Sequence, residues 1–85
     1  MEFDLTITSV SGEIFSGKCS SLTLPLSDGL YTILPNHSPV VAALAEGIIS
    51  FTSGDNKISY NISDGLTVFE NNSARVLVNN CTVCK

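Results

Sequence analysis

The chain's single histidine, His37, lies between Pro35 and Pro39 in the segment LPNHSP. A histidine in such a segment could serve as a general base, a metal ligand, a corner that shapes the fold, or a contact for another protein. Nucleophilic catalysis would need a serine held against this base, but the chain has no G-x-S-x-G turn between a strand and a helix. The eight carboxylates are scattered, mostly in turns, and no glycine-rich phosphate loop occurs. The residues therefore predict a protein that is not an enzyme, with His37 either structural or in contact with a partner.

The three cysteines, Cys19, Cys81 and Cys84, could provide thiol or metal chemistry. An odd number of cysteines without a secretion signal favours reduced thiols over a disulfide framework. The CTVC segment has the spacing of half a zinc site, but tetrahedral zinc needs four ligands, and only Cys19 and His37 remain to complete it. We expect the thiols to be inert, with no metal and no cofactor.

Composition sets the class of protein. Eighty-five residues make one domain, which is 44% apolar but only 14% charged. The longest apolar run, VVAALA, is too short to cross a bilayer, and the acidic, alternating N-terminus resembles neither a signal nor a transit peptide. With a net charge of −4 and four cations, the chain has no basic patch for nucleic acid. The surplus of apolar residues points instead to a protein partner.

Sequence patterns typical of β-strands run along the whole chain, so strands must position His37 and the cysteines. Apolar and polar residues alternate in FDLTIT, SLTLPL and KISYNIS, and turn-forming residues recur every eight to ten positions. This spacing is typical of an all-β sandwich or barrel. We predict SPVVAALAE to be a strand, and Pro25 to mark an edge or a bulge because proline cannot donate to an interior ladder. The two SDG triplets, with Asp28 and Asp64, predict turns.

Three motifs, in order and correctly spaced, resemble the N-terminal β-sandwich of the epsilon subunit of F-type ATP synthases. That family has an FSG strand, a corner of the form GELGILPGHAPL followed by a strand and a glycine, and later VSGGFLEV and NxVTVLAD. The matching residues here are Phe15, Ser16, Gly17, Gly29, Ile33, Leu34, Pro35, His37, Pro39, Gly47, Ser63, Gly65, Asn72, Val76 and Leu77. The likeness covers nearly all of residues 3–80. Asn36 and Ser38 replace the family's glycine and alanine, and Leu30 and Thr32 replace glutamate and glycine.

The resemblance implies a flattened antiparallel β-sandwich of about ten short strands over residues 1–80, followed by a tail over residues 81–85. It implies a non-catalytic rotor subunit that links gamma to the membrane rotor ring and couples proton flow to ATP synthesis. The place would be the cytoplasmic face of the bacterial inner membrane, or its plastid equivalent, with membrane contact only through the complex. By resemblance, Ser9, His37 and Ser63 lie on the gamma side. The loop of Asp28, Gly29, Leu30 and Tyr31 faces the ring, where the apolar Leu30 favours an apolar contact over charge pairing.

The family usually carries two C-terminal helices after the sandwich, whereas this sequence stops at Lys85. The expectation is therefore a subunit that couples without inhibiting by helix extension. Two other readings of the residues stay open beside the resemblance. One is a free-standing sandwich that binds a small ligand or carbohydrate, and the other is a thiol or zinc protein built on the three cysteines.

Overall fold

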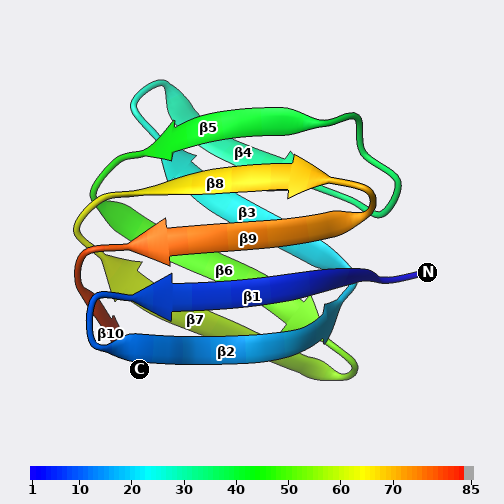
Figure 1. Ribbon diagram of the computed structural model, residues 1–85, viewed down its shortest axis with the longest axis horizontal. Helices are drawn as coiled ribbons and strands as arrows, with labels where there is room; N and C mark the ends of the chain where they lie inside the picture. Colours follow the sequence, from blue (N-terminus) through cyan, green and yellow to red (C-terminus); the bar gives the residue numbers. More distant parts are fainter. Residues whose placement is uncertain (84–85) are drawn as a thin grey trace.

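The computed structural model describes residues 1–83, which form two packed layers of strands (Figure 1). No helix occurs among these residues. The ten strands are β1 (Phe3–Ser9), β2 (Gly12–Cys19), β3 (Ser21–Leu26), β4 (Gly29–Ile33), β5 (Val40–Leu44), β6 (Gly47–Ser53), β7 (Asn56–Ile62), β8 (Gly65–Glu70), β9 (Ser73–Val78) and β10 (Cys81–Val83). The predicted all-β sandwich of about ten short strands is confirmed, and the SPVVAALAE segment contributes a strand, β5.

Each layer is a five-stranded sheet. The front sheet of Figure 1 has the order β2-β1-β9-β8-β5, and the back sheet has the order β10-β7-β6-β3-β4. Neighbouring strands are antiparallel except for β1 and β9, which run parallel at the centre of the front sheet. The sequence patterns did not predict this one parallel pair. Strand β10 pairs with β7 through Cys81, Thr82 and Val83, so regular structure continues beyond residue 80, where the sequence placed the start of a tail.

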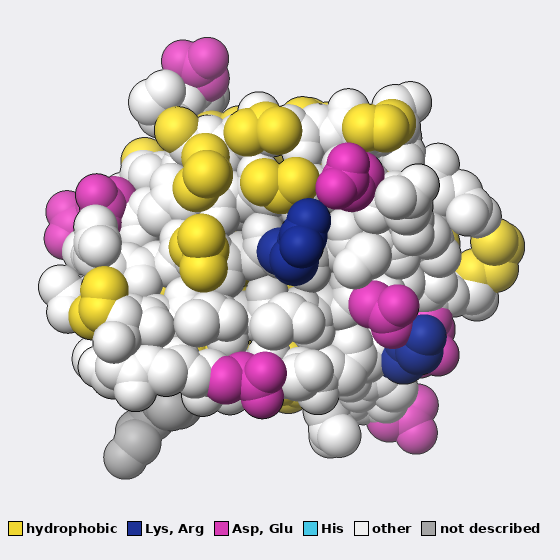
Figure 2. Space-filling view, viewed as in Figure 1, with side chains coloured by type: hydrophobic (Ala, Val, Ile, Leu, Met, Phe, Trp, Pro, Cys, Tyr) yellow, Lys and Arg dark blue, Asp and Glu magenta, His cyan; other side chains and the backbone are white. Residues whose placement is uncertain are grey.

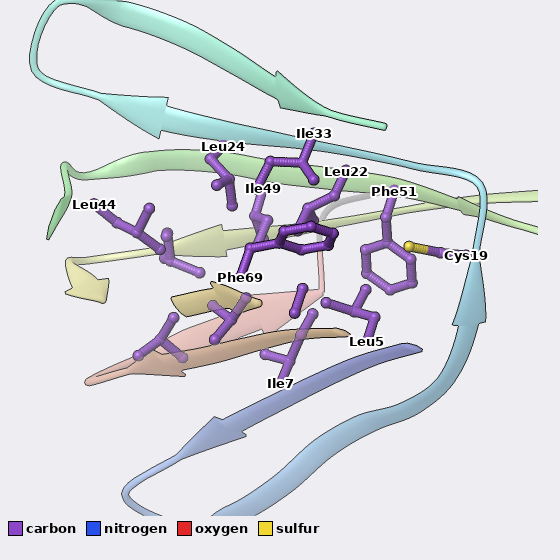
Figure 3. Close-up of a cluster of buried hydrophobic side chains, with 14 of the residues drawn as sticks. Leu5, Ile7, Cys19, Leu22, Leu24, Ile33, Leu44, Ile49, Phe51 and Phe69 are labelled. Carbon is purple, nitrogen blue, oxygen red and sulfur yellow. The ribbon is translucent and has the colours of Figure 1, made fainter. Parts of the chain in front are cut away.

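The core forms because alternate residues of each strand point between the two sheets. In β1, Phe3, Leu5 and Ile7 are buried, while Asp4 and Thr6 between them point outward. Figure 3 shows side chains from the two sheets meeting in one cluster. The front sheet is joined across its strands by the edge-to-face packing of Phe3 on Phe69, with ring centroids 5.4 Å apart. The alternation read from the sequence therefore predicts the core correctly.

Three asparagines with positive φ shape one end of the sandwich. Asn71 and Asn72, at φ 52° and 56°, form the two-residue turn between β8 and β9, which needs positive φ at both positions. The Asn72 side chain accepts a hydrogen bond from the Asn36 backbone N–H at 2.7 Å and donates one to the Glu2 carbonyl at 3.0 Å. One asparagine thus holds the LPNHSP corner and the N-terminal segment against the β8–β9 turn.

Pro25 lies in β3 at the point where its ladder to β6 has ended. The β3–β6 pairs stop at Thr23 and Ser50, so no β6 residue requires a backbone donor from the proline. The Pro25 carbonyl accepts a hydrogen bond from the Ala45 N–H at 2.8 Å instead. A Cβ at Gly47 would lie 2.8 Å from the Pro25 Cβ, so the close passage of β6 beside the proline requires glycine there. The prediction that Pro25 marks an edge strand or a bulge is therefore wrong: β3 lies between β6 and β4, and its pairing with β4 continues through Pro25, but its ladder to β6 ends before the proline.

Candidate docking surface

The LPNHSP corner is a tight turn built by the residue types that it contains. The His37 N–H donates to the Leu34 carbonyl at 3.2 Å, with Pro35 and Asn36 in the two central positions. Asn36 has φ 66°, so the arrangement is a type II turn, in which the second central residue needs positive φ. After glycine, asparagine is among the residues that most readily adopt positive φ, which explains how Asn36 can stand where the family has glycine.

Both ring nitrogens of His37 are occupied. Nδ1 lies 2.6 Å from the Ser38 carbonyl oxygen, which can only accept, so Nδ1 carries the proton. In the neutral ring Nε2 then accepts the hydrogen bond from the Tyr31 hydroxyl at 2.7 Å. The ring also packs edge-on against Phe69, with centroids 5.9 Å apart. His37 therefore connects β4 of the back sheet to β8 of the front sheet and has no nitrogen left to act as a base.

The two cysteines that the structure describes are poor sites for thiol chemistry. Cys19 is fully buried in the core, and this burial raises the pKa of its thiol to about 11. Burial also raises the pKa of the half-buried Cys81 thiol. Thiolates are the reactive form, so both side chains are less reactive than a free cysteine. Across residues 1–83, no three His, Cys, Asp or Glu side chains lie close enough to hold a metal ion. Cys84 lies outside the described residues.

The proposed ring-facing loop is the hairpin between β3 and β4. Its two-residue turn is closed by Leu26 and Gly29, and Gly29 has φ 128°, a value that side chains rarely allow. Asp28 is exposed, and Leu30 is 74% exposed, so an apolar side chain stands at the tip. Tyr31 differs from the rest because it packs against the core and holds His37. The structure therefore brings Asp28, Gly29 and Leu30 together on the surface and turns Tyr31 inward.

Ser9 and Ser63 lie at the opposite end of the sandwich from His37. Ser9 ends β1, and its hydroxyl closes the turn to Gly12 at 3.3 Å. Ser63 precedes β8 and donates to the Asp64 carboxylate at 3.2 Å. His37 contacts Phe69 near the other end of β8, and six residues of extended chain from Ser63 to Phe69 span roughly 20 Å. The three residues assigned to the gamma side therefore do not form one cluster.

An exposed apolar area on the outside of the front sheet was missed by the sequence analysis. We call it the apolar face; it consists of Val10, Val41, Ala43, Leu66, Val68 and Leu77. Leu77 and Val41 are 56% and 67% exposed. Figure 2 shows yellow side chains gathered over β5, β8 and β9, with one basic side chain beside them. Arg75 lines a hollow with Leu66, Val68 and Leu77 and pairs with Glu70 at 3.4 Å. Strands β8 and β9 could have revealed the face, because their sequences LTVF and VLV place apolar residues on both sides of the sheet.

The apolar face is hollowed rather than flat. Two adjoining hollows of about 410 and 260 Å³ share Thr8, Leu66 and Leu77. The first hollow reaches Ser9, so one of the predicted gamma-side residues borders the apolar face. Contiguous apolar surface of this kind, with hydroxyl groups at its margin, is typical of a protein contact.

Comparison with known proteins gives the family. The family described as "ATP synthase, Delta/Epsilon chain, beta-sandwich domain" matches residues 2–83. The ATP synthase epsilon chain of Leptospira interrogans (serovar copenhageni) is 33% identical over 75 residues, which cover 86% of this chain and 59% of that one. ATP synthase epsilon chain 2 of Photobacterium profundum is 39% identical over 67 residues, covering 75% and 45%. The matched residues therefore span about half the length of these relatives.

Solved structures share the fold. A chain of the Euglena gracilis mitochondrial ATP synthase superposes with a TM-score of 0.89 at 22% identity, over 96% of this chain and 53% of that one. A chain of the Tetrahymena thermophila central stalk and c-ring gives 0.82 at 11% identity, over 98% and 67%. Within residues 1–83, no helix is long and apolar enough to cross a membrane. With the sandwich, the corner motif and the match over residues 2–83 in agreement, this chain belongs to the delta/epsilon-chain β-sandwich family of ATP synthases.

Proposed function

We propose that this chain acts as a non-catalytic central-stalk subunit of an F-type ATP synthase, joining the gamma subunit to the membrane rotor ring so that rotation driven by proton flow reaches the catalytic head. The observation that carries the proposal is the apolar face on a rigid two-layer sandwich of this family. Two packed sheets deform little under load, which suits a part that transmits torque. The site is the cytoplasmic face of the bacterial inner membrane, or its plastid equivalent, and the subunit touches the membrane only through the complex.

The apolar face is the best candidate for the gamma contact. Its hollows accept apolar side chains, and Ser9 at its margin is small enough for a partner's backbone to approach closely. Ser63 lies near the same end, before β8. We assign His37 a different role, because its two ring hydrogen bonds and its packing on Phe69 keep the LPNHSP corner rigid. A corner that is already rigid loses less conformational entropy when the subunit docks.

The β3–β4 hairpin is the candidate contact with the rotor ring. Its exposed residues, Asp28, Gly29 and Leu30, project from the body of the sandwich, and the exposed Leu30 offers an apolar contact. We expect Leu30→Glu to leave the folded domain intact, because the side chain is 74% exposed, and to lower ATP-driven proton pumping in reconstituted vesicles. Unchanged pumping would show that this hairpin is not a coupling contact.

Binding to the ATP synthase head complex depleted of this subunit tests the gamma contact directly. We expect Leu77→Asp to weaken binding by roughly 100-fold, because an unpaired carboxylate would be buried in an apolar contact. Ile48→Asp is the matched control: Ile48 is 46% exposed and belongs to the back sheet, so its replacement should leave binding unchanged. If the unmodified chain does not bind the depleted complex, the proposed function is wrong. If both variants bind normally, the apolar face is not the contact.

A further inference from the structure

The front sheet ends in an open edge at β5. Among residues 1–83, strand β5 pairs only with β8 and is the last strand in its sheet order. Figure 1 shows it along the upper rim of the front sheet. An edge strand presents unpaired N–H and C=O groups, and proteins that must stay apart usually protect such edges with charges, prolines or bulges.

The pairing pattern identifies which backbone groups of β5 are unpaired. The two-residue turn between β8 and β9 makes Glu70 and Ser73 a hydrogen-bonded pair. Hydrogen-bonded pairs with β9 then recur at every second residue of β8, at Val68 and Leu66. The backbone groups of the residues between them, Thr67 and Phe69, therefore bond to β5. Thr67 lies opposite Ala42 on that strand. The N–H and C=O groups of Val41 and Ala43 therefore point away from the sheet.

The residue after the strand agrees with this assignment. Counting on by two from Ala43 predicts that the N–H of Ala45 also points away from β8. It does, because it donates to the Pro25 carbonyl of the back sheet at 2.8 Å. Val41 and Ala43 are thus two consecutive outward-facing positions on the free edge of β5.

No charged residue protects this edge. From Gly29 to Ala45 the sequence has no Asp, Glu, Lys or Arg, and the side chains of Val41 and Ala43 are both exposed. The opposite edge of the front sheet differs. Strand β2 carries Glu13 and Lys18, and the Lys18 carbonyl accepts a hydrogen bond from the Ser53 hydroxyl at 2.7 Å. Strand β10 forms one edge of the back sheet and has only three residues within the described chain. Very short edge strands are one of the ways in which proteins protect a sheet edge.

We propose that the β5 edge binds an extended segment of the gamma subunit, which adds to the front sheet as a sixth strand. An extended backbone is the ligand that matches a row of unpaired N–H and C=O groups. Val41 and Ala43 belong to the apolar face as well, so the added strand would continue the surface proposed to contact gamma. A second copy of this chain is a weaker fit, because each copy carries a net charge of −4. The inference rests on the proposed function and specifies how its contact is made.

Amide hydrogen exchange, with and without the gamma-containing head complex depleted of this subunit, tests the proposal. In the free chain, the amides of Val41 and Ala43 should exchange fast, while that of Ala42 is protected by its bond to β8. On binding, exchange at Val41 and Ala43 should slow by at least about 100-fold, since new backbone hydrogen bonds cover them. This alternate-residue pattern distinguishes strand addition from contact through the apolar face alone.

Two variants of Ala43 provide an independent measurement. Ala43→Pro removes an outward N–H without touching the β8 ladder, so it should lower affinity roughly tenfold and leave the melting temperature unchanged. Ala42→Pro is the matched control, which should lower the melting temperature because its N–H bonds to β8. Ala43→Lys places a charge on the edge and should weaken binding even if the proline disturbs the fold.

The outcomes separate the inference from the proposed function. A complex that forms while Val41 and Ala43 still exchange fast would overturn strand addition and leave the stalk function standing. Absence of any complex with the unmodified chain would overturn the proposed function and the inference with it. Protection of Val41 and Ala43 in the isolated chain that grows with its concentration would show a second copy on the edge, and would overturn the assignment to gamma.

Discussion

Replacing His37 by alanine should destabilise the isolated domain substantially. The substitution removes the hydrogen bonds from Nδ1 to the Ser38 carbonyl and from the Tyr31 hydroxyl to Nε2. Each is worth about 0.5–1.5 kcal/mol, and the lost packing on Phe69 adds about 0.5–1.5 kcal/mol. The sum, about 1.5–4.5 kcal/mol, is a large part of the roughly 5–15 kcal/mol that stabilises a typical domain.

The assay is urea unfolding of four chains: the unmodified protein, His37→Ala, Tyr31→Phe and the double variant. Tyr31→Phe removes only the bond to Nε2, so it should cost about 0.5–1.5 kcal/mol. Because that bond is already absent in His37→Ala, the double variant should be less destabilised than the two single costs added together, with a coupling energy of about 1 kcal/mol. A cost below about 0.5 kcal/mol for His37→Ala, together with lost binding to the head complex, would refute the structural role and assign His37 to partner contact.

Three further outcomes follow from single residues. Thr67→Val should raise the free energy of unfolding by about 1–2 kcal/mol in urea denaturation, since the Thr67 hydroxyl is fully buried and has no hydrogen-bond partner; a loss of stability would mean that this hydroxyl is paired. Asn72→Ala should cost about 2–4 kcal/mol, because it loses two side-chain hydrogen bonds and leaves alanine at positive φ, while Asn72→Gly should cost less; equal costs would show that the backbone conformation is unimportant. For Cys19, the folded pKa of about 11 lies above the ordinary value of 9.0, so the unfolded chain releases its proton first and stability should fall as pH rises from about 9 to 11. Cys19→Ala should flatten that fall, and an equally steep fall in this variant would assign it to other groups.

The strands and the core could be predicted from sequence because they depend on local alternation. Leu5 and Ile7 on one side of β1, and Asp4 and Thr6 on the other, are sufficient to place that strand against the core. The positive φ of Asn36 was also predictable, since asparagine is one of the few residue types that tolerate it and the turn from Leu34 to His37 needs it at this position. These features require no knowledge of which strands are neighbours.

The pairing of distant strands could not be predicted in the same way. Parallel contact between β1 and β9 depends on how both sheets close, which no local pattern records. The separation of His37 from Ser9 and Ser63 follows from that topology, and the inward turn of Tyr31 depends on the position of His37 across the corner. The apolar face was missed because Leu66 and Leu77 have the same character as their buried neighbours, so sequence alone does not distinguish the inner side from the outer.

The contact between β1 and β9 also constrains the order of events during folding. Strand β1 has β2 on one side, but its other neighbour is Ser73–Val78, and Asp4 pairs with Ser73, 69 residues later in the chain. Until that segment emerges, the apolar side of β1 has no completed sheet around it, and the growing chain must keep Phe3, Leu5 and Ile7 from wrong contacts. Pairing over such a distance along the chain slows folding and exposes unfinished edges to aggregation. We therefore expect chains cut before residue 73 to accumulate as insoluble material or to be degraded.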